Sequence, residues 1–352
     1  MGVRVRQLFC GANYTRRMSS QRVTVADIAR AAGVSVGTVS NALNGRRSQT
    51  AQATIDYVLA TAERLGYRGN SAAAALRTGH HGVIGLLLPR FVRALSFYMD
   101  FALGVEEAAA RADLDLMLVT ADRPAGINRV KVDGAIVVDW THELAGPASL
   151  KKAGIPVVSA GGTPVLDASP DRVVRVQYET YVRQIVSAAH SAGARRALML
   201  AADSNFQSDW ARATQEAFQS SCEELNIESM THPIAVNADR DSVLDIAEDV
   251  ARRFPAEFVL VGPQRFAGIL NSKFGWGGPG SDVRFLASCA GDPVTELAST
   301  QIAAIDAAPR AFGDRCVTEL IQLMNAGVQQ AFTTTTHPAS VSWPLHWGRS
   351  TR

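Results

Sequence analysis

The chain has 352 residues, of which 47% are hydrophobic and 19% charged, and its formal net charge is +2 at pH 7. This balance is typical of a globular protein and excludes the disordered, collagen-like and fibrous classes. One hydrophobic core rarely organises more than about 250 to 300 residues, so the length predicts two or three domains. No apolar run approaches the ~18 to 20 residues that a membrane-spanning helix needs, and we therefore expect a soluble protein with no membrane partner.

The positive charge is concentrated at the N-terminal end of the chain. Residues 1–80 hold eleven arginines, no lysine and three acidic residues, which gives a net charge of +8 and leaves −6 for the remainder. A basic segment joined to an acidic one suggests that the first meets a polyanion, although a solvated basic surface would show the same asymmetry.

Residues 1–22 are predicted to form a flexible basic arm. The apolar patch around Phe9 has fewer than five residues, whereas an export signal needs about 7 to 15, so secretion is not expected. Met18 is an alternative start of translation, because the first regular pattern begins just after it, and the residues leave both starts open.

Motifs of catalysis and metal binding are missing from the sequence. It has no phosphate-binding loop, no His-Glu-x-x-His and no Gly-x-Ser-x-Gly elbow after a predicted strand, so we expect no enzymatic activity. The seven histidines show no ligand spacing, and we expect neither a metal nor a cofactor. The four cysteines are Cys10, Cys222, Cys289 and Cys316. They form no Cys-x-x-Cys pair, which fits a reducing cytoplasm.

The segment 23–69 predicts a helix-turn-helix domain. Thr24 is placed to cap a first helix, Gly33 to end it in the left-handed conformation, and Ser35 to cap a second helix from Val36 to about Leu43. The second helix carries short side chains on its outer face, which allows a helix to lie deep in the major groove of DNA.

A third helix, from about Gln52 to Leu65, is expected to cover the first two. The apolar residues that we expect in their shared core are Val25, Ile28, Ala29, Ala32, Val39, Ala42, Leu43, Ile55, Val58, Leu59, Ala62 and Leu65. Residues 70–81 follow as a hinge helix and linker. The stretch from Asn70 to Gly79 is rich in alanine but has no apolar face wide enough to be stable alone, so we expect a partner to order it.

Two stretches of this N-terminal region resemble the DNA-binding headpiece and hinge of the LacI (lactose-repressor) family, namely VTVADIARAAGVSVGTVSNALNG and LGYRGNSAAAALRTG. The resemblance implies a homodimer on a palindromic operator in double-stranded DNA, with the second helix in the major groove and two hinge helices in the minor groove. It also implies roles for single residues. The expected base readers are Val36, Gly37 and Asn41, the expected phosphate contacts are Thr24, Thr38, Ser40 and Asn44, Ala73 approaches the groove floor, and Leu76 inserts between bases.

The same residues allow plainer interpretations. Leu76 could be an ordinary core leucine, and Asn41 a solvated surface residue. Asn41 stands where family members often have an arginine or another long reader, and Gly37 offers no side chain to a base. The operator sequence is therefore expected to differ from those of other members.

Residues 82–352 alternate short apolar runs with amphipathic stretches, which predicts parallel sheets covered by helices on both faces. The expected strands are Val83–Leu88, Leu114–Val119, Gly134–Val138, Pro156–Ser159, Ala197–Ala201, Phe258–Val261, Val283–Ala287 and Ile302–Ile305. The expected helices are Phe101–Ala112, Tyr181–Ala192, Asp209–Leu225, Ser242–Arg253 and Phe312–Ala326.

Landmarks such as VIGLLLP, KVDGAIVV and SAGARRALMLA resemble the effector domain of the same family. The fold class that this implies is an all-α helix-turn-helix headpiece followed by a two-lobed α/β domain with parallel sheets, similar to periplasmic sugar-binding proteins. That second domain, residues 82–352, would both bind the effector and form the dimer.

In such a domain a ligand binds beyond the carboxyl ends of the strands. Aromatic faces stack on sugar or base rings, while arginine and aspartate bond to hydroxyl groups. The expected effector-binding residues are Phe97, Tyr98, Trp140, Arg212, Gln264 and Asp292, and we expect the effector to be a carbohydrate or a related metabolite. Each of these residues could instead be structural.

The expected pocket departs from the family pattern at several places, two of which concern residues of the expected site. Thr214 stands where many members have an arginine, with Arg212 as the nearest substitute. Pro263 and Gln264 stand where an Asn-Asp pair is common. An altered or absent effector response therefore stays open.

The sequence thus predicts a dimeric, cytoplasmic transcription regulator, in this family most often a repressor, whose DNA affinity responds to a small molecule. The alternative is a solute-binding module or a sugar-acting enzyme that carries a basic N-terminal appendage.

Overall fold

The computed structural model describes residues 23–43, 50–67, 79–88, 96–120, 131–140, 145–162, 170–204, 208–326 and 333–347. The chain divides into two compact units, Met1–Gly79 and His80–Arg352. Among the described residues, no helix combines the length and the apolar character that crossing a membrane requires.

The first unit contains three described helices, α1 (Val25–Ala32), α2 (Val36–Leu43) and α3 (Gln52–Arg64). Their shared core is formed by Ile28, Ala29, Val39, Ala42, Ile55, Val58 and Ala62, as the apolar spacing predicts. The prediction that Leu59 is buried is wrong, because its side chain is 44% exposed. Two short helices cover only a narrow stripe of α3, and position 59 falls outside that stripe.

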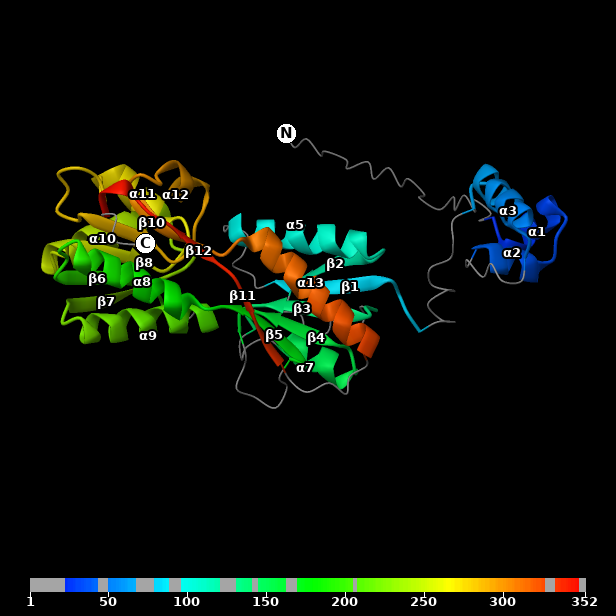
Figure 1. Ribbon diagram of the computed structural model, residues 1–352, viewed down its shortest axis with the longest axis horizontal. Helices are drawn as coiled ribbons and strands as arrows, with labels where there is room; N and C mark the ends of the chain where they lie inside the picture. The colour runs from blue at the N-terminus through cyan, green and yellow to red at the C-terminus, as the bar shows by residue number, and fades with distance from the viewer. Residues whose placement is uncertain are drawn as a thin grey trace, which may run out of the picture. The chain divides into compact units, whose positions relative to one another are not determined.

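The second unit contains two six-stranded sheets (Figure 1). The first has the order β11-β5-β4-β3-β1-β2 and the second β12-β10-β9-β8-β6-β7. Among the described strands all pairs are parallel except β10 with β12. The strands of the first sheet are β1 (Val83–Leu88), β2 (Asp115–Thr120), β3 (Gly134–Val138), β4 (Val157–Ala160), β5 (Arg172–Val176) and β11 (Thr333–His337). Those of the second are β6 (Arg196–Ala202), β7 (Glu228–Ile234), β8 (Phe258–Val261), β9 (Phe285–Ser288), β10 (Ile302–Asp306) and β12 (Ser340–Ser342).

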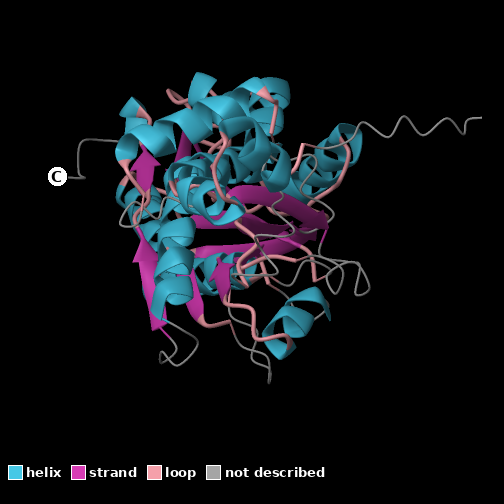
Figure 2. Cartoon of the chain, turned by 90° about the vertical axis from the view of Figure 1, so that its right-hand side faces the viewer, coloured by secondary structure: helices cyan, strands magenta, loops and turns pink. Residues whose placement is uncertain are grey.

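Helices lie on both faces of each sheet, as the strand and helix alternation predicts (Figure 2). The helices of the second unit are α5 (Ser96–Arg111), α7 (Ala145–Lys152), α8 (Tyr178–Ser191), α9 (Asp209–Glu224), α10 (Arg240–Arg253), α11 (Phe266–Phe274), α12 (Pro293–Leu297) and α13 (Pro309–Ala326), with a short 3-10 turn at Leu345–Trp347. On the first sheet, α5 and α13 cover one face and α7 the other. On the second, α8 and α9 cover one face and α10 and α11 the other.

The helices α5 and α13 lie side by side at close approach (Figure 1). A Cβ atom added to Gly104 would lie 2.1 Å from the carbonyl oxygen of Arg310, and one added to Gly313 would lie 2.4 Å from that of Phe101. Only glycine leaves room for the facing backbone at these two positions. This contact matters for the site, because Phe97 and Tyr98 lie in the first turn of α5.

The chain passes between the two lobes three times, at residues 176–178, 306–309 and 337–340. The first sheet therefore receives its edge strand β11 and its covering helix α13 from the last part of the chain. At the third crossing the buried His337 ring stacks on Phe312 at 4.8 Å, and its Nε2 lies 3.1 Å from the carbonyl oxygen of Ala307.

Candidate functional site

The second helix of the N-terminal unit has its start set by a local hydrogen bond. Gly33 ends α1 with φ 68°, in the left-handed region. The Ser35 hydroxyl accepts a hydrogen bond from the backbone N–H of Thr38 at 3.0 Å, as a cap does. Val39 and Ala42 hold the inner face of α2 in the core. The inner face of α2 therefore packs in the core, whereas Val36 and Gly37 on its outer face are exposed.

The residues predicted to read bases lie on that outer face. Val36 is 53% exposed, Gly37 is exposed and Asn41 is half-buried. All three sit on one short helix that carries no acidic or basic residue. Within this unit, two of the three predicted readers are therefore exposed and the third is half-buried.

Of the residues predicted to contact phosphate, Thr24 also caps a helix. Thr24 forms a capping box with Asp27, in which the Asp27 N–H donates to Thr24 Oγ1 at 3.3 Å and the Thr24 N–H donates to Asp27 Oδ2 at 3.0 Å. Thr38 Oγ1 lies 2.9 Å from the Ser35 hydroxyl, and Ser40 is half-buried on α2. Asn44, Ala73 and Leu76 lie outside the described residues.

A cavity of about 50 Å³ lies between the two lobes of the second unit, beyond the carboxyl ends of the strands. Phe97, Tyr98 and Gln264, three of the residues expected there, line it together. The Phe97 N–H of the first lobe donates to Gln264 Oε1 of the second at 3.3 Å. Gln264 Nε2 donates to the Gly291 carbonyl at 2.7 Å, so both ends of this amide are engaged.

Asp139 provides the carboxylate of the cavity. It directly follows β3, is 5% exposed, and accepts a hydrogen bond from the Tyr98 hydroxyl. Burial raises the pKa of Asp139 to about 7, and the charge of Asp209 adds to the shift, while the Tyr98 bond opposes it. Burial, together with the Asp139 charge, likewise raises the pKa of Tyr98 well above its usual range. The pair is thus held where ionisation is costly.

Three other residues expected in the pocket do not line it. Trp140 packs against Leu87 and Leu150 on the opposite face of the first sheet. Arg212 is 58% exposed at its side chain and pairs with acids of its own helix. Asp292 is buried but caps α12, where its Oδ1 accepts from the Thr295 N–H at 2.8 Å.

The placement of Trp140 has a local cause. Ile136 and Val138 face one side of the sheet and Ala135 and Val137 the other. Strict alternation would place Trp140 with Val138 on the cavity side. Asp139, however, has φ 47°, in the left-handed region. We infer that this turn exchanges the two sides, so that Asp139 reaches the cavity and Trp140 does not.

Several lining residues were not expected from the sequence. Besides Asp139, they include the rings of Tyr178, Trp210 and Phe312. Trp210 belongs to the segment that suggested Arg212, and Asp139 directly precedes Trp140, so the segments were found and the individual side chains were not. Tyr178 lies at the end of the first crossing between the lobes, and Phe312 lies just after the second. No strand-end pattern marks either residue.

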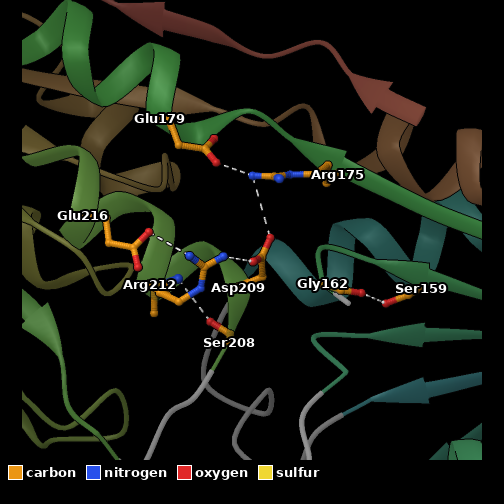
Figure 3. A network of polar contacts seen from close by, with 9 residues as sticks. Ser159, Gly162, Arg175, Glu179, Ser208, Asp209, Arg212 and Glu216 are labelled. Carbon is orange, nitrogen blue, oxygen red and sulfur yellow. Dashed lines mark hydrogen bonds and ion pairs between the residues drawn. The ribbon is translucent and has the colours of Figure 1, made fainter. Parts of the chain in front are cut away.

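A network of ion pairs connects the lobes beside the cavity (Figure 3). Arg175 of β5 contacts Glu179 and reaches Asp209 of α9 at 3.8 Å. Arg212 bonds to Asp209 at 2.6 Å and to Glu216 at 2.7 Å. Two guanidinium groups therefore share three carboxylates, and both are engaged with acids.

The N-terminal unit matches a known family. Residues 24–70 match the profile of a family described as "Bacterial regulatory proteins, lacI family". Catabolite control protein A of Priestia megaterium is 32% identical over 45% of this chain and 48% of that protein. The maltose regulon regulatory protein MalI of Escherichia coli is 45% identical over 26% of this chain and 25% of that protein. The chain thus spans about half the length, or less, of the curated relatives it matches.

Solved structures with the same fold cover nearly all of the chain. A Lac repressor dimer bound to operator and the anti-inducer ONPF aligns with a TM-score of 0.77 over 92% of this chain and 98% of that chain, at 17% identity. A complex of the transcriptional regulator CelR with cellobiose aligns with a TM-score of 0.61 over 91% of this chain and 98% of that one, at 18% identity. At these identities the likeness concerns the fold, and it confirms the predicted fold class.

Proposed function

Because residues 24–70 match the lacI family of bacterial regulatory proteins, we propose that the chain is a sequence-specific DNA-binding transcription regulator. The observation that carries the proposal is the second helix of the N-terminal unit, whose inner face is fixed in the core and whose outer face is exposed. Short side chains there would allow the helix backbone to approach base edges closely.

The proposal includes a homodimer that binds a palindromic operator and acts as a repressor. A two-fold protein matches two half-sites about one helical turn apart or a multiple of that distance. Its work on genomic DNA would place the protein in the cytoplasm, and it would act there by binding, without catalysis.

The roles of Ala73 and Leu76 in the minor groove stay predictions from the sequence. An apolar wedge unstacks one base step at a cost of a few kcal/mol and recovers it through contacts to the bent duplex.

The proposal also includes an effector in the cavity between the lobes. A ligand that contacts both lobes would bind one relative lobe arrangement better than others, and it would shift the population toward that arrangement. A carbohydrate effector is expected from the sequence and stays a prediction. Maltose and cellobiose are named for two similar proteins, MalI and CelR, and not for this chain.

The test is selection of binding sites from random duplex DNA by the full chain, followed by gel shifts on the selected site. We expect a palindromic consensus and a clear preference over scrambled duplex that survives at about 200 mM salt. Asn41→Ala should relax specificity at one position of each half-site, whereas Asp239→Ala, an exposed helix cap of the second unit, should leave binding unchanged.

Two outcomes would overturn the proposal. One is binding without a consensus that salt abolishes, which is the behaviour of a basic surface alone. The other is full biological activity after deletion of residues 1–80, which would favour a solute-binding module with a basic appendage.

A further inference from the structure

The cavity between the lobes contains a buried acid that has no positive partner among the described residues. Asp139 is 5% exposed, and among the described residues the Tyr98 hydroxyl is the side chain that hydrogen-bonds to it. None of the described residues that line the cavity is cationic. A carboxylate in such a place is stable either as the neutral acid or beside a positive charge. The described lining leaves that charge for a ligand to supply.

The charges around the cavity favour a cation as well. Arg175 and Arg212 are both bound to carboxylates, and the three acids of that network outnumber them (Figure 3). The negative charge of Asp209 acts on Asp139 directly. An anionic ligand would meet a surplus of negative charge here, whereas a cation would relieve it.

The walls of the cavity are aromatic. Five rings line it, those of Phe97, Tyr98, Tyr178, Trp210 and Phe312. Ring faces attract ammonium and guanidinium groups, and most strongly where water is excluded. The neutral amide of Gln264 already uses its oxygen and its nitrogen within the protein. A polyol such as a sugar would therefore find few groups to satisfy its hydroxyls.

The size of the cavity restricts the ligand further. About 50 Å³ of space corresponds to roughly three to five water-sized groups. A disaccharide exceeds this space in the lobe arrangement described here.

We propose that the cavity between the lobes binds a small organic cation, an ammonium or amidinium group on a compact apolar body, with its charge at Asp139 and its body against the aromatic side chains. This inference rests on the proposed function, because it assigns the effector of the same cavity. It differs from the carbohydrate that the sequence suggests.

The test compares three probes with the same short alkyl chain and different charge, by calorimetric titration of the full chain at neutral pH. Propylamine is a cation, 1-propanol is its neutral counterpart and propionate is an anion. We expect propylamine to bind about ten-fold or more tightly than 1-propanol, and propionate, maltose and cellobiose to give no signal.

Two variants locate the charge. Asp139→Asn keeps the shape and an acceptor for Tyr98, and it should remove most of the preference for propylamine over 1-propanol. Asp292→Asn changes another buried aspartate that does not line the cavity, and it should leave the preference intact. If Asp139→Asn does not fold, the comparison of the three probes on the unmodified chain decides alone.

Equal binding of propylamine and 1-propanol, no binding of either, or tight binding of a disaccharide would overturn the inference. A preference that persists in Asp139→Asn would overturn the role of that residue. Site selection on random DNA is read separately. A palindromic consensus without amine binding would refute only the cation, whereas the absence of a consensus would refute the proposed regulator.

Discussion

The two units of this chain hold their functional groups in opposite ways. The N-terminal unit presents short side chains on the outside of α2, and its stability resides in a few apolar residues on the inside. The second unit encloses an acid and five aromatic rings between two lobes, and several of the residues that line its cavity are also part of its hydrophobic core. Function and stability should therefore be separable in the first unit and coupled in the second.

The largest expected effect concerns the enclosed carboxylate. The pKa of Asp139 rises from 3.8 in the unfolded chain to about 7 in the folded one. The neutral acid thus favours folding, and this contribution is complete below about pH 4 and lost as the pH rises through about 7. At 1.36 kcal/mol for each pH unit, the contribution amounts to about 4 kcal/mol at most.

Chemical denaturation at several pH values tests this, with Asp139→Asn as the reference that lacks the titration. All five tryptophans lie beyond residue 80, so their fluorescence reports unfolding of the second unit. The unmodified chain should lose stability relative to Asp139→Asn between about pH 4 and pH 7. Parallel pH profiles would show that the acid is not enclosed as described.

The next effect concerns the packing beneath the cavity. Gly104→Ala places a Cβ atom 2.1 Å from the Arg310 carbonyl oxygen, so α5 and α13 must separate. We expect a loss of about 2 to 3 kcal/mol, measured by tryptophan fluorescence in denaturant. Because α5 carries Phe97 and Tyr98, the same change should weaken ligand binding.

Gly85→Ala is the matched control. Its Cβ atom would meet Val132 at 3.6 Å, an ordinary contact, and its unfolding midpoint should stay close to that of the unmodified chain. Equal losses from both substitutions would contradict the role given to the contact between α5 and α13.

The smallest effect on stability belongs to the exposed surface. Val36→Ala removes a side chain that is 53% exposed, and we expect the stability of the first unit to change by less than about 0.5 kcal/mol. Affinity for the selected operator should nevertheless fall by about 1 kcal/mol or more if Val36 touches a base. Hydrogen exchange over α1 to α3 measures the first quantity and gel shifts the second. A large loss of protection would mean that reading and stability are not separable.

The helices of the N-terminal unit could be predicted from the sequence because their ends depend on residues that are close together in the chain. Thr24 as a cap, Gly33 in the left-handed region and the bounds of α2 each depend on residues within one turn. Leu59 was mispredicted because its burial depends on where α1 and α2 lie. That information is not local to α3.

The second unit and its cavity could be predicted from the sequence only in part. Buried strands such as β1 and β3 are apolar runs and were predicted. Four of the described strands were missed: β5 is buried but carries two arginines, the edge strand β7 is mostly polar and contains a proline, β11 is a run of threonines, and β12 has only three residues. The strand-end rule found the neighbourhood of Asp139 and chose the wrong neighbour, Trp140. A single left-handed residue decides between them, and only the folded chain shows it.

The threefold passage of the chain between the lobes has a consequence for synthesis. The N-terminal helices are complete once residue 64 has left the ribosome. The first lobe, in contrast, lacks α13 and β11 until residue 337 has emerged, and by then nearly all of the second lobe exists. We expect the nascent N-terminal unit to fold early and alone, while the first lobe stays unfinished until nearly all of the second lobe has been synthesised.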